Sequence, residues 1–332
     1  MTRVLFATEG GASIGFGHLA RCFALSQAFE ERGVSSGFVI AGDMTAKNVL
    51  GTRNLDLCPW FEEEEALFQK MADADIVIAD SYRIDEALYD KVSKRARIPV
   101  YLDDSGRLEI SQGVLINGNL YAANLRYPKK SGITYLLGPE YISLRKPFWE
   151  IGEKKIRKKV ERVLVSFGGD DSKRMTPQVL RFLTRQYPKM TKNVIIGRAF
   201  EKTKDIENMA DNYTTLIEAP DAEEMKRVML TSDLAITSGG QTLLELARVG
   251  LPAVVVAVAD NQRKNIEAWE KNRFIEFAGY WDEKDLVENI SMKFRLFLDH
   301  AKRHQSRDAG RRIVTGNGAR KIVQFLVEKL NS

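Results

Sequence analysis

Histidine is rare in this chain, and one of its three copies, His18, follows a glycine-rich segment. That segment, Glu9 to Gly17, comes directly after the apolar run Val4–Thr8, which we predict to be a strand. Glycines let the backbone turn sharply and approach a ligand closely. A helix beginning near Gly17 would place its positive dipole end beside the histidine, which disfavours the imidazolium. A neutral imidazole can accept a proton near neutral pH, so His18 is a candidate general base, with a hydrogen-bonded structural histidine as the alternative.

The glycine spacing argues against two common nucleotide-binding motifs. No Gly-Lys-Ser/Thr follows, so the segment is not a P-loop. Gly15 to Ala20 fits G-x-G-x-x-A, and Asp43 could contact a ribose. However, six residues, Glu9 to Ile14, separate the strand from these glycines, whereas the dinucleotide motif has its glycines directly after the strand. The sequence therefore disfavours dinucleotide binding.

The second half of the chain carries a comparable turn between a predicted strand, Leu234–Thr237, and a predicted helix. The turn Ser238–Gly240 could present backbone N–H groups and a hydroxyl to a phosphate at the start of that helix. Glu245 lies one turn into the helix and could accept hydrogen bonds from both ribose hydroxyls. Thr242-Leu-Leu-Glu245 also has the pattern of a capping box, and spacing alone slightly favours capping.

Two further loops should lie at the same edge of this second sheet. One contains Gly168 and Gly169, and the other contains Asn261 and Gln262 after the predicted strand Ala253–Val258. Asn and Gln can both donate and accept, which suits sugar hydroxyls and acetamido groups. Ordinary turn chemistry is the alternative for both loops.

Metal and disulfide sites find little support in the sequence. The acidic pairs Asp103-Asp104 and Asp170-Asp171 could suggest a metal, but neither has a histidine nearby in the sequence, and we predict no metal site. Two cysteines are too few for a disulfide framework or a four-thiolate zinc site, which fits the cytoplasm.

Charge is unevenly distributed along the chain. Residues 1–150 carry 17 Lys and Arg against 20 Asp and Glu, a net −3, and residues 151–332 carry 33 against 25, a net +8. A nucleic-acid-binding domain would cluster its charge with aromatic residues, whereas here the cations are spread over predicted helix faces. We therefore expect solvated surface or a phosphorylated ligand, and no nucleic acid. With no signal peptide and no apolar run near the roughly 20 residues that span a bilayer, we expect a cytoplasmic protein without stable membrane insertion.

Short apolar runs alternate with helix-length amphipathic ones, which predicts parallel α/β sheets. The length of 332 residues suits two domains, which we place at 1–150 and 151–332, with a charged, exposed connection at Glu153–Arg162 and a last helix at Gly318–Leu330. Ligand loops at the carboxyl ends of both sheets would enclose a cleft. The other predicted strands are Gly37–Ala41, Ile76–Ala79, Val100–Leu102, Val114–Ile116, Val163–Phe167, Asn193–Ile196 and Thr215–Ile217.

Six segments together resemble a known family. It is the nucleotide-sugar hydrolase of the pseudaminic-acid pathway, which releases UDP from a UDP-linked 2,4-diacetamido-2,4,6-trideoxy sugar, with the related spore-coat polysaccharide proteins. The resemblance implies the GT-B fold, an α/β architecture with two Rossmann-like domains whose parallel sheets face a central cleft. The segments are Ile14–Arg21, Tyr101–Asp104, Leu115–Ala122, Ser166–Asp170, Ser238–Glu245 and Asn261-Gln262.

The resemblance also implies roles for individual residues. His18 would be the general base that activates a water for inverting attack on the anomeric carbon, with no cofactor. Glu245 would contact the ribose, in preference to capping. The nucleotide would be bound by Gly168, Gly169, Ser238, Gly239, Gly240, Gln241, Thr242 and Glu245. The sugar would be bound by Gly17, Tyr82, Asp104, Asn261 and Gln262.

The sequence departs from the family at two positions that should line the sugar pocket. Ala7-Thr8-Glu9 stands where the family commonly has Arg-x-Asp, and Ser81 stands where a histidine can occur. The sugar, or the nucleotide, can therefore differ from the family's. We expect a UDP-sugar hydrolase of nonulosonic acid or surface polysaccharide biosynthesis. The alternatives are a GT-B glycosyltransferase, in which His18 deprotonates an acceptor hydroxyl, and a non-catalytic nucleotide-sugar-binding protein.

Overall fold

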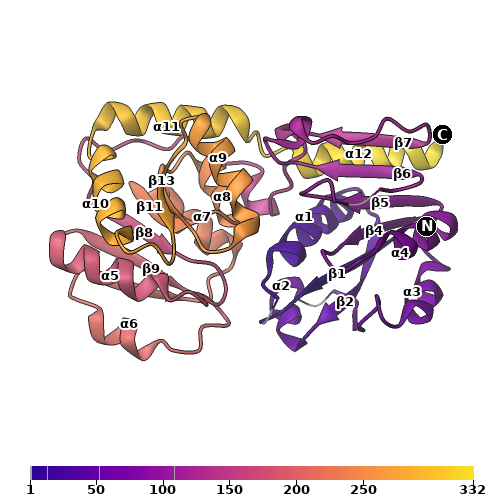
Figure 1. Ribbon diagram of the computed structural model, residues 1–332, viewed down its shortest axis with the longest axis horizontal. Helices are drawn as coiled ribbons and strands as arrows, with labels where there is room; N and C mark the ends of the chain where they lie inside the picture. Colours follow the sequence, from indigo (N-terminus) through magenta and orange to yellow (C-terminus); the bar gives the residue numbers. More distant parts are fainter. Residues whose placement is uncertain (1, 13, 52, 108) are drawn as a thin grey trace. The chain divides into compact units, whose positions relative to one another are not determined.

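The computed structural model describes residues 2–12, 14–51, 53–107 and 109–332. The chain divides into two compact units, each built around one parallel sheet (Figure 1). The first unit consists of Met1–Lys146 and Gly316–Ser332, and the second of Pro147–Thr315. Among the described residues, no helix combines the length and the apolar character needed to cross a membrane.

The sheet of the first unit has seven strands within the described residues, in the order β3-β2-β1-β4-β5-β6-β7. Strands β4 and β5 are buried at every position, which is typical of parallel sheets and explains their continuous apolar runs. The predicted strands did not include β3, which has only three residues, or β7, whose side chains are mostly half-buried at the edge of the sheet. The strands are β1 (Arg3–Gly10), β2 (Ser35–Gly42), β3 (Leu55–Leu57), β4 (Ile76–Asp80), β5 (Ile98–Leu102), β6 (Gly113–Asn117) and β7 (Ile133–Leu137).

The last helix of the chain belongs to the first unit (Figure 1, yellow). It contacts α1, and Arg320 pairs with Glu31 through two contacts of 2.8 and 2.7 Å. The predicted boundary placed residues 151–332 in the second domain, but the contacts return Gly316–Ser332 to the first, because the apolar side of this helix is buried there. The helices of this unit are α1 (Gly17–Glu31), α2 (Lys47–Leu50), α3 (Glu64–Met71), α4 (Glu86–Arg95) and α12 (Gly318–Asn331).

The sheet of the second unit has six parallel strands, counted over residues 147–315, in the order β10-β9-β8-β11-β12-β13. The predicted strands are all present, and β13 was missed. The strands are β8 (Arg162–Ser166), β9 (Thr191–Ile196), β10 (Thr214–Glu218), β11 (Leu234–Ser238), β12 (Ala253–Ala257) and β13 (Ile275–Tyr280). The helices are α5 (Met175–Gln186), α6 (Lys204–Met209), α7 (Ala222–Thr231), α8 (Gln241–Val249), α9 (Arg263–Lys271), α10 (Leu286–Leu296) and α11 (His300–Ile313).

The charged segment predicted as an exposed connection is tied into the second unit. Lys154 is only 2% exposed, and its ammonium donates to the carbonyl oxygens of Met229, Leu230 and Ser232 at 3.0, 2.8 and 2.5 Å. These carbonyls lie at the end of α7, where the helix leaves its last acceptors without backbone donors. The segment is therefore charged but not simply solvated, because one of its lysines caps a helix.

In both sheets the strand order reverses beside the first strand. β1 lies between β2 and β4, and β8 lies between β9 and β11. Loops that leave the carboxyl ends of the two central strands therefore diverge at a switch point, which is where open α/β sheets bind ligands. The glycine-rich segment before His18 follows β1, and the turn Ser238–Gly240 follows β11.

Candidate active site and nucleotide-binding loops

The glycine-rich segment of the first unit forms a tight loop between β1 and α1. Gly11 and Gly15 exchange two backbone hydrogen bonds, of 3.1 and 2.8 Å, and Gly15 has a φ of +94°, which favours glycine. Helix α1 then begins at Gly17, and its N-cap residue Phe16 supplies no side-chain hydrogen bond. The loop thus delivers His18 to the first turn of a helix, as predicted.

Asp43, which could have contacted a ribose, instead supports this loop. Its carboxylate accepts hydrogen bonds from the backbone N–H of Ala12 at 2.9 Å and of Thr45 at 2.8 Å. These bonds lower the pKa of Asp43, with the hydrogen bond from the Thr45 side chain as the main cause. A Cβ on Gly11 would lie 2.3 Å from an Asp43 oxygen, so only glycine permits this close approach.

His18 is held by a buried carboxylate. Its Nδ1 lies 2.7 Å from Oδ1 of Asp80, the last residue of β4, whose side chain is fully buried. Nη2 of Arg21 is 3.1 Å from the same Nδ1, but it also donates to Oδ1. Because an ionised carboxylate only accepts, Nδ1 must carry a proton, and the neutral ring keeps its lone pair on Nε2. Nε2 is therefore the atom that can accept a proton.

Arg21 lies one turn beyond His18 and joins two carboxylates. Its Nε donates to Asp80 at 2.6 Å, and its Nη1 donates to Asp104 at 2.6 Å. Burial alone would raise the pKa of Asp80, but the charge of Arg21 and the hydrogen bonds from Arg21 and His18 outweigh it and lower that pKa. Burial likewise opposes the ionised form of Asp104, yet Arg21 lowers the pKa of this group too. Both carboxylates are consequently held ionised near neutral pH.

Asp104 is the centre of a second set of polar contacts. It accepts hydrogen bonds from the Tyr82 hydroxyl at 2.8 Å and from the Asn119 amide at 2.9 Å, and its carbonyl accepts from Tyr121 at 2.9 Å. The Tyr82 ring meets the His18 ring edge-on, with centroids 4.6 Å apart. Burial, with the nearby Asp104 charge, raises the pKa of Tyr82, so the hydroxyl stays protonated and donates. The structure thus brings three predicted residues, His18, Tyr82 and Asp104, into one network.

A further carboxylate closes the other side of His18. Oε1 of Glu9 lies 3.7 Å from Nε2, and it accepts a hydrogen bond from the Tyr82 backbone N–H at 2.7 Å. Glu9 is 2% exposed, and its Oε2 has no hydrogen-bond partner among the residues described. His18 is therefore flanked by a carboxylate at each ring nitrogen.

In the second unit, the predicted turn connects β11 to α8. The backbone N–H of Gly239 donates to Oε1 of Gln262 at 3.2 Å, and its carbonyl accepts from Asn265 at 2.9 Å. A Cβ on Gly239 would lie 2.6 Å from Ile266, so the turn requires glycine where α9 approaches. Oε1 of Gln262 also accepts from Val258 at 3.1 Å, so any ligand contact by Gln262 would come from its amide Nε2.

The capping-box interpretation of this turn is wrong. Helix α8 begins at Gln241, its N-cap is Gly240, and no side chain caps it. Thr242 therefore lies inside the first turn, and Glu245 is buried on the same helix. The first-turn N–H groups are left without a side-chain cap, which is the arrangement that binds phosphates at helix starts.

The remaining predicted residues surround this turn or lie beside it. Gly168 has a φ of +83°, and the carbonyl of Gly169 accepts from Ala199 at 2.9 Å, which positions the loop after β8. Asn261 is exposed in the short 3-10 helix η5 (Asp260–Gln262) after β12. Gly168, Gly169, Ser238 and Asn261 thus all follow the carboxyl ends of neighbouring strands in one sheet.

The acidic pairs have structural partners. Asp103 accepts hydrogen bonds from the backbone of Ser105 at 3.1 Å and of Gly106 at 2.8 Å, and from the Tyr127 hydroxyl at 2.7 Å. Asp171 accepts from the first two N–H groups of α5, at 2.8 and 2.9 Å. Each of these carboxylates therefore orders a loop or a helix start.

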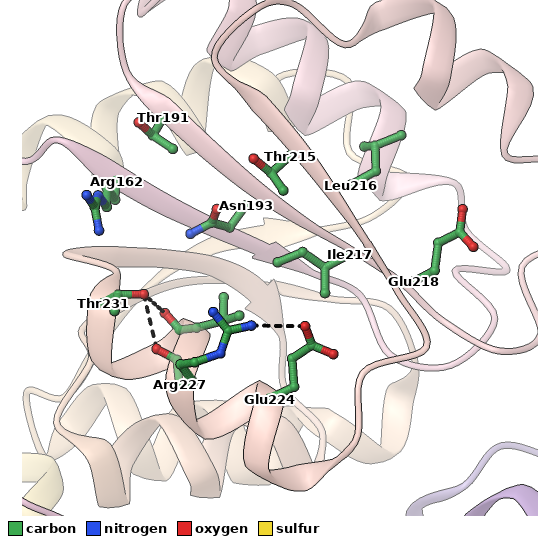
Figure 2. A pocket seen from close by; sticks show the side chains of 11 residues that line it. Arg162, Thr191, Asn193, Thr215, Leu216, Ile217, Glu218, Glu224, Arg227 and Thr231 are labelled. Carbon is green, nitrogen blue, oxygen red and sulfur yellow. Dashed lines mark hydrogen bonds and ion pairs between the residues drawn. The ribbon is translucent and has the colours of Figure 1, made fainter.

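A separate cavity of about 520 Å³ lies along β10 and α7 (Figure 2). It reaches the first residues of β8 and β9, and Arg227, paired with Glu224 at 3.0 Å, lines one side. None of the residues predicted for the site lines it. The cavity is therefore separate from the predicted site residues.

Sequence reasoning missed several members of the first network. Arg21 ends the matched segment Ile14–Arg21, and Asp80 lies in none of the matched segments. Only the fold brings β4 beside β1 and so places Asp80 against His18. Asn119 lies in the matched segment Leu115–Ala122. Glu9 was noted only as part of Ala7-Thr8-Glu9, which departs from the family pattern, and its contact with His18 was not predicted.

The chain is similar to two known proteins over most of its length, and no family model matches it. It is 21% identical to the spore coat polysaccharide biosynthesis protein SpsG of Bacillus subtilis over 328 residues, covering 96% of each chain. It is 22% identical to an uncharacterised protein of Methanocaldococcus jannaschii over 275 residues, or 79% of this chain. That match spans 57% of the archaeal protein, so the chain corresponds to little more than half of that relative's length.

Solved structures identify the fold. MurG of Acinetobacter baumannii has a TM-score of 0.66 at 12% identity, covering 99% of this chain and 100% of that one. MnaA of S. aureus, solved with UDP, scores 0.69 at 11% identity, with 100% and 97% covered. Phytolacca americana UGT2, solved with UDP-2fluoro-glucose and pterostilbene, scores 0.70 at 10% identity over both whole chains. The chain has the GT-B fold, which confirms the expectation from the resemblance.

Proposed function

We propose that this chain hydrolyses a UDP-sugar at the anomeric carbon. The observation that carries the proposal is the contact of His18 with Asp80, which fixes the proton on Nδ1 and leaves Nε2 as the acceptor. His18 lies in the first turn of α1, and its Nδ1 contacts the buried carboxylate of Asp80, which can stabilise the imidazolium formed when Nε2 takes a proton. Such a pair is suited to general-base catalysis.

The proposed reaction is a single displacement. The oxygen of a water forms a bond to the anomeric carbon, and Nε2 of His18 takes one proton from that water. The bond from the anomeric carbon to the UDP oxygen breaks, and its electron pair leaves with the diphosphate. Because the water attacks opposite the leaving group, the anomeric configuration inverts.

We propose that the second unit binds the nucleotide. Ser238, Gly239 and Gly240 offer an uncapped helix start to the diphosphate, and Glu245 accepts from the ribose. Gly168 and Gly169, with Gln241 and Thr242, complete the set. Two proteins with this fold, MnaA of S. aureus and Phytolacca americana UGT2, were solved with UDP or a UDP-sugar, which supports the choice of nucleotide.

We propose that the sugar is bound by the network around Asp104, with Gly17, Tyr82, Asn261 and Gln262 as contacts. The diacetamido-trideoxyhexose class follows from the family resemblance. The similarity to SpsG, a spore coat polysaccharide biosynthesis protein, supports a role in surface polysaccharide synthesis. The role in nonulosonic acid synthesis, like the sugar class, follows from the family resemblance. Glu9 and Ser81 differ from the family pattern at this pocket, so a related UDP-sugar is included in the proposal.

The test incubates the purified protein with a panel of UDP-sugars, without acceptor and with EDTA, and measures UDP and free sugar. His18→Asn should lower the rate about 10²-fold or more, because the proton acceptor is lost. His304→Asn, on α11 of the second unit, is the matched control and should leave the rate unchanged. In ¹⁸O-water the label should enter the sugar. A rate for His18→Asn within a few-fold of the wild type would overturn the role of His18.

A glycosyltransferase is the second candidate, because solved glycosyltransferases share this fold. In that case His18 would deprotonate an acceptor hydroxyl, and UDP would appear only after a saccharide acceptor is added. A non-catalytic sensor would bind the UDP-sugar and release no UDP with or without acceptor. The same incubation, repeated with and without acceptor, separates these three functions.

A further inference from the structure

The proton-accepting nitrogen of His18 faces a second acceptor. Nε2 and Oε1 of Glu9 are 3.7 Å apart, which is too long for a direct hydrogen bond. Oε1 is held in place by the Tyr82 N–H, and Oε2 has no partner among the described residues. A buried carboxylate with one neutral donor is costly to maintain. A glutamate at this position therefore calls for a role in binding.

The spacing of the two acceptors fits one small donor. An oxygen atom about 2.9 Å from each, an ordinary hydrogen-bond length, completes a triangle with Nε2 and Oε1. To satisfy both acceptors, that oxygen must carry two hydrogens, one directed to Nε2 and one to Oε1. Water has two such hydrogens, whereas a hydroxyl of an alcohol or a saccharide has one.

We propose that Glu9 and His18 jointly hold the attacking water, and that Glu9 thereby selects water over an acceptor hydroxyl. This inference rests on the proposed function. An alcohol that donated its one hydrogen to Nε2 would have only its carbon or a lone pair to turn toward Glu9. The carboxylate, only 2% exposed, would then lose the donor that a water supplies. The pair thus disfavours transfer to any acceptor with a single O–H.

The reaction step assigns each hydrogen of the water. The hydrogen on Nε2 is transferred as a proton as the oxygen bonds to the anomeric carbon and UDP leaves with the bonding electrons. The hydrogen on Oε1 stays on the oxygen and becomes that of the product hydroxyl. Glu9 neither gains nor loses a proton, so it acts as a positioning residue, and its carboxylate helps stabilise the positive charge on His18.

A first test needs no variant. The wild-type protein is incubated, in buffer containing methanol, with a UDP-sugar that it hydrolyses. The amounts of methyl glycoside and free sugar are then measured. The expected result is a methyl glycoside fraction well below the molar share of methanol among the nucleophiles. A fraction equal to that share would overturn the selection of water. If no UDP-sugar is hydrolysed at all, the proposed function fails first and this inference falls with it.

Two variants with side chains close to glutamate in volume then test the role of the acceptor oxygen Oε1 of Glu9. Glu9→Met removes it and should lower hydrolysis about 10-fold to 100-fold, the equivalent of a lost hydrogen bond to a charged group. It should also raise the ratio of methyl glycoside to free sugar. Glu9→Gln should restore both toward the wild type, since the Tyr82 N–H needs an oxygen at Oε1 and so keeps an acceptor facing Nε2.

The outcome that contradicts the proposal is specific. Equal methanol-to-water ratios in the wild type and in Glu9→Met, at any hydrolysis rate, would show that Glu9 does not choose the nucleophile. Equal losses of hydrolysis rate in Glu9→Met and Glu9→Gln would also contradict the proposed role of Glu9. Thermal melting followed by circular dichroism checks that each variant is folded, and if Glu9→Met does not fold, the wild-type and Gln ratios still decide.

Discussion

At the scale of single residues, the first unit assembles a histidine between two carboxylates. Asp80 contacts Nδ1 at 2.7 Å, and Glu9 faces Nε2 at 3.7 Å. The difference in distance separates their tasks, because the shorter contact is a hydrogen bond and the longer one leaves room for an atom to be bound by both groups. Arg21 balances the charge of Asp80, so this carboxylate can stay ionised while buried.

Asp80→Asn should lower the turnover number about 10²-fold, because the neutral amide no longer stabilises the imidazolium of His18. UDP affinity, measured by calorimetry, should stay the same if the second unit binds the nucleotide. The matched control is Asp103→Asn, whose carboxylate orders a neighbouring loop without contacting His18. A turnover within a few-fold of the wild type would show that Asp80 has only a structural role.

The sequence was sufficient to predict that His18 lies at the start of a helix, because the signal for that position is local. The glycine loop, the strand before it and the helix after it all lie within a short stretch of chain. Asp80 carries no such signal, since it is 62 residues away and becomes a partner only when β4 pairs with β1. The buried environment of Glu9 is likewise a property of the packed sheet. Roles that depend on neighbouring strands could not be predicted from spacing.

At the scale of elements, the second unit has two helix ends that its sequence did not reveal, the start of α8 and the end of α7. The N-cap of α8 is Gly240, and no side chain caps this helix start. At the end of α7, Lys154 donates hydrogen bonds to three carbonyl oxygens. The strands were predictable from their apolar runs. The two helix ends were not, since the capping pattern begins at Thr242, two residues after the actual N-cap Gly240, and Lys154 lies in a charged run that is typical of an exposed surface.

Lys154 should make stability depend on pH. Burial lowers its pKa to about 8, while an unfolded lysine titrates near 10.4. Between these values the unfolded chain binds more protons, so the free energy of unfolding should rise with pH. The increase in the free energy of unfolding, on the order of 3 kcal/mol, is complete above the pKa of the unfolded lysine. It is lost as the pH falls to about 8, the pKa in the folded protein.

Urea unfolding at pH 8, 9 and 10 measures this effect. Lys154→Met should remove the rise, and Lys155→Met, at the exposed neighbouring position, should keep it. The same pH dependence in both variants would mean that Lys154 ionises alike in the folded and unfolded states.

At the scale of the whole molecule, the GT-B fold is built from a discontinuous unit and a continuous one. The sequence predicted two domains of similar size because apolar runs alternate along the whole chain. It could not show that α12 returns to the first unit, since its apolar face would suit any partner surface. Its contacts with α1 and the pairing of Arg320 with Glu31 show where it packs.

Removal of residues 316–332 should destabilise the first unit severely. Ile322, Val323 and Leu326 are fully buried, and each contributes about 1.5–3 kcal/mol, a large share of a typical total of about 5–15 kcal/mol. The expected result in thermal unfolding is loss or marked lowering of one transition. Removal of the exposed Asn331 and Ser332 is the control and should change nothing. An unchanged melting profile for the longer deletion would contradict the packing of α12.

The return of α12 also bears on the order in which the chain can fold as it leaves the ribosome. Residues 147–315 form a continuous segment, so this unit has all its parts before synthesis ends. The first unit, although translated earlier, waits for residues 316–332. Until then the surface that α12 covers is exposed on the nascent chain. The unit that carries His18 should therefore mature after the second unit.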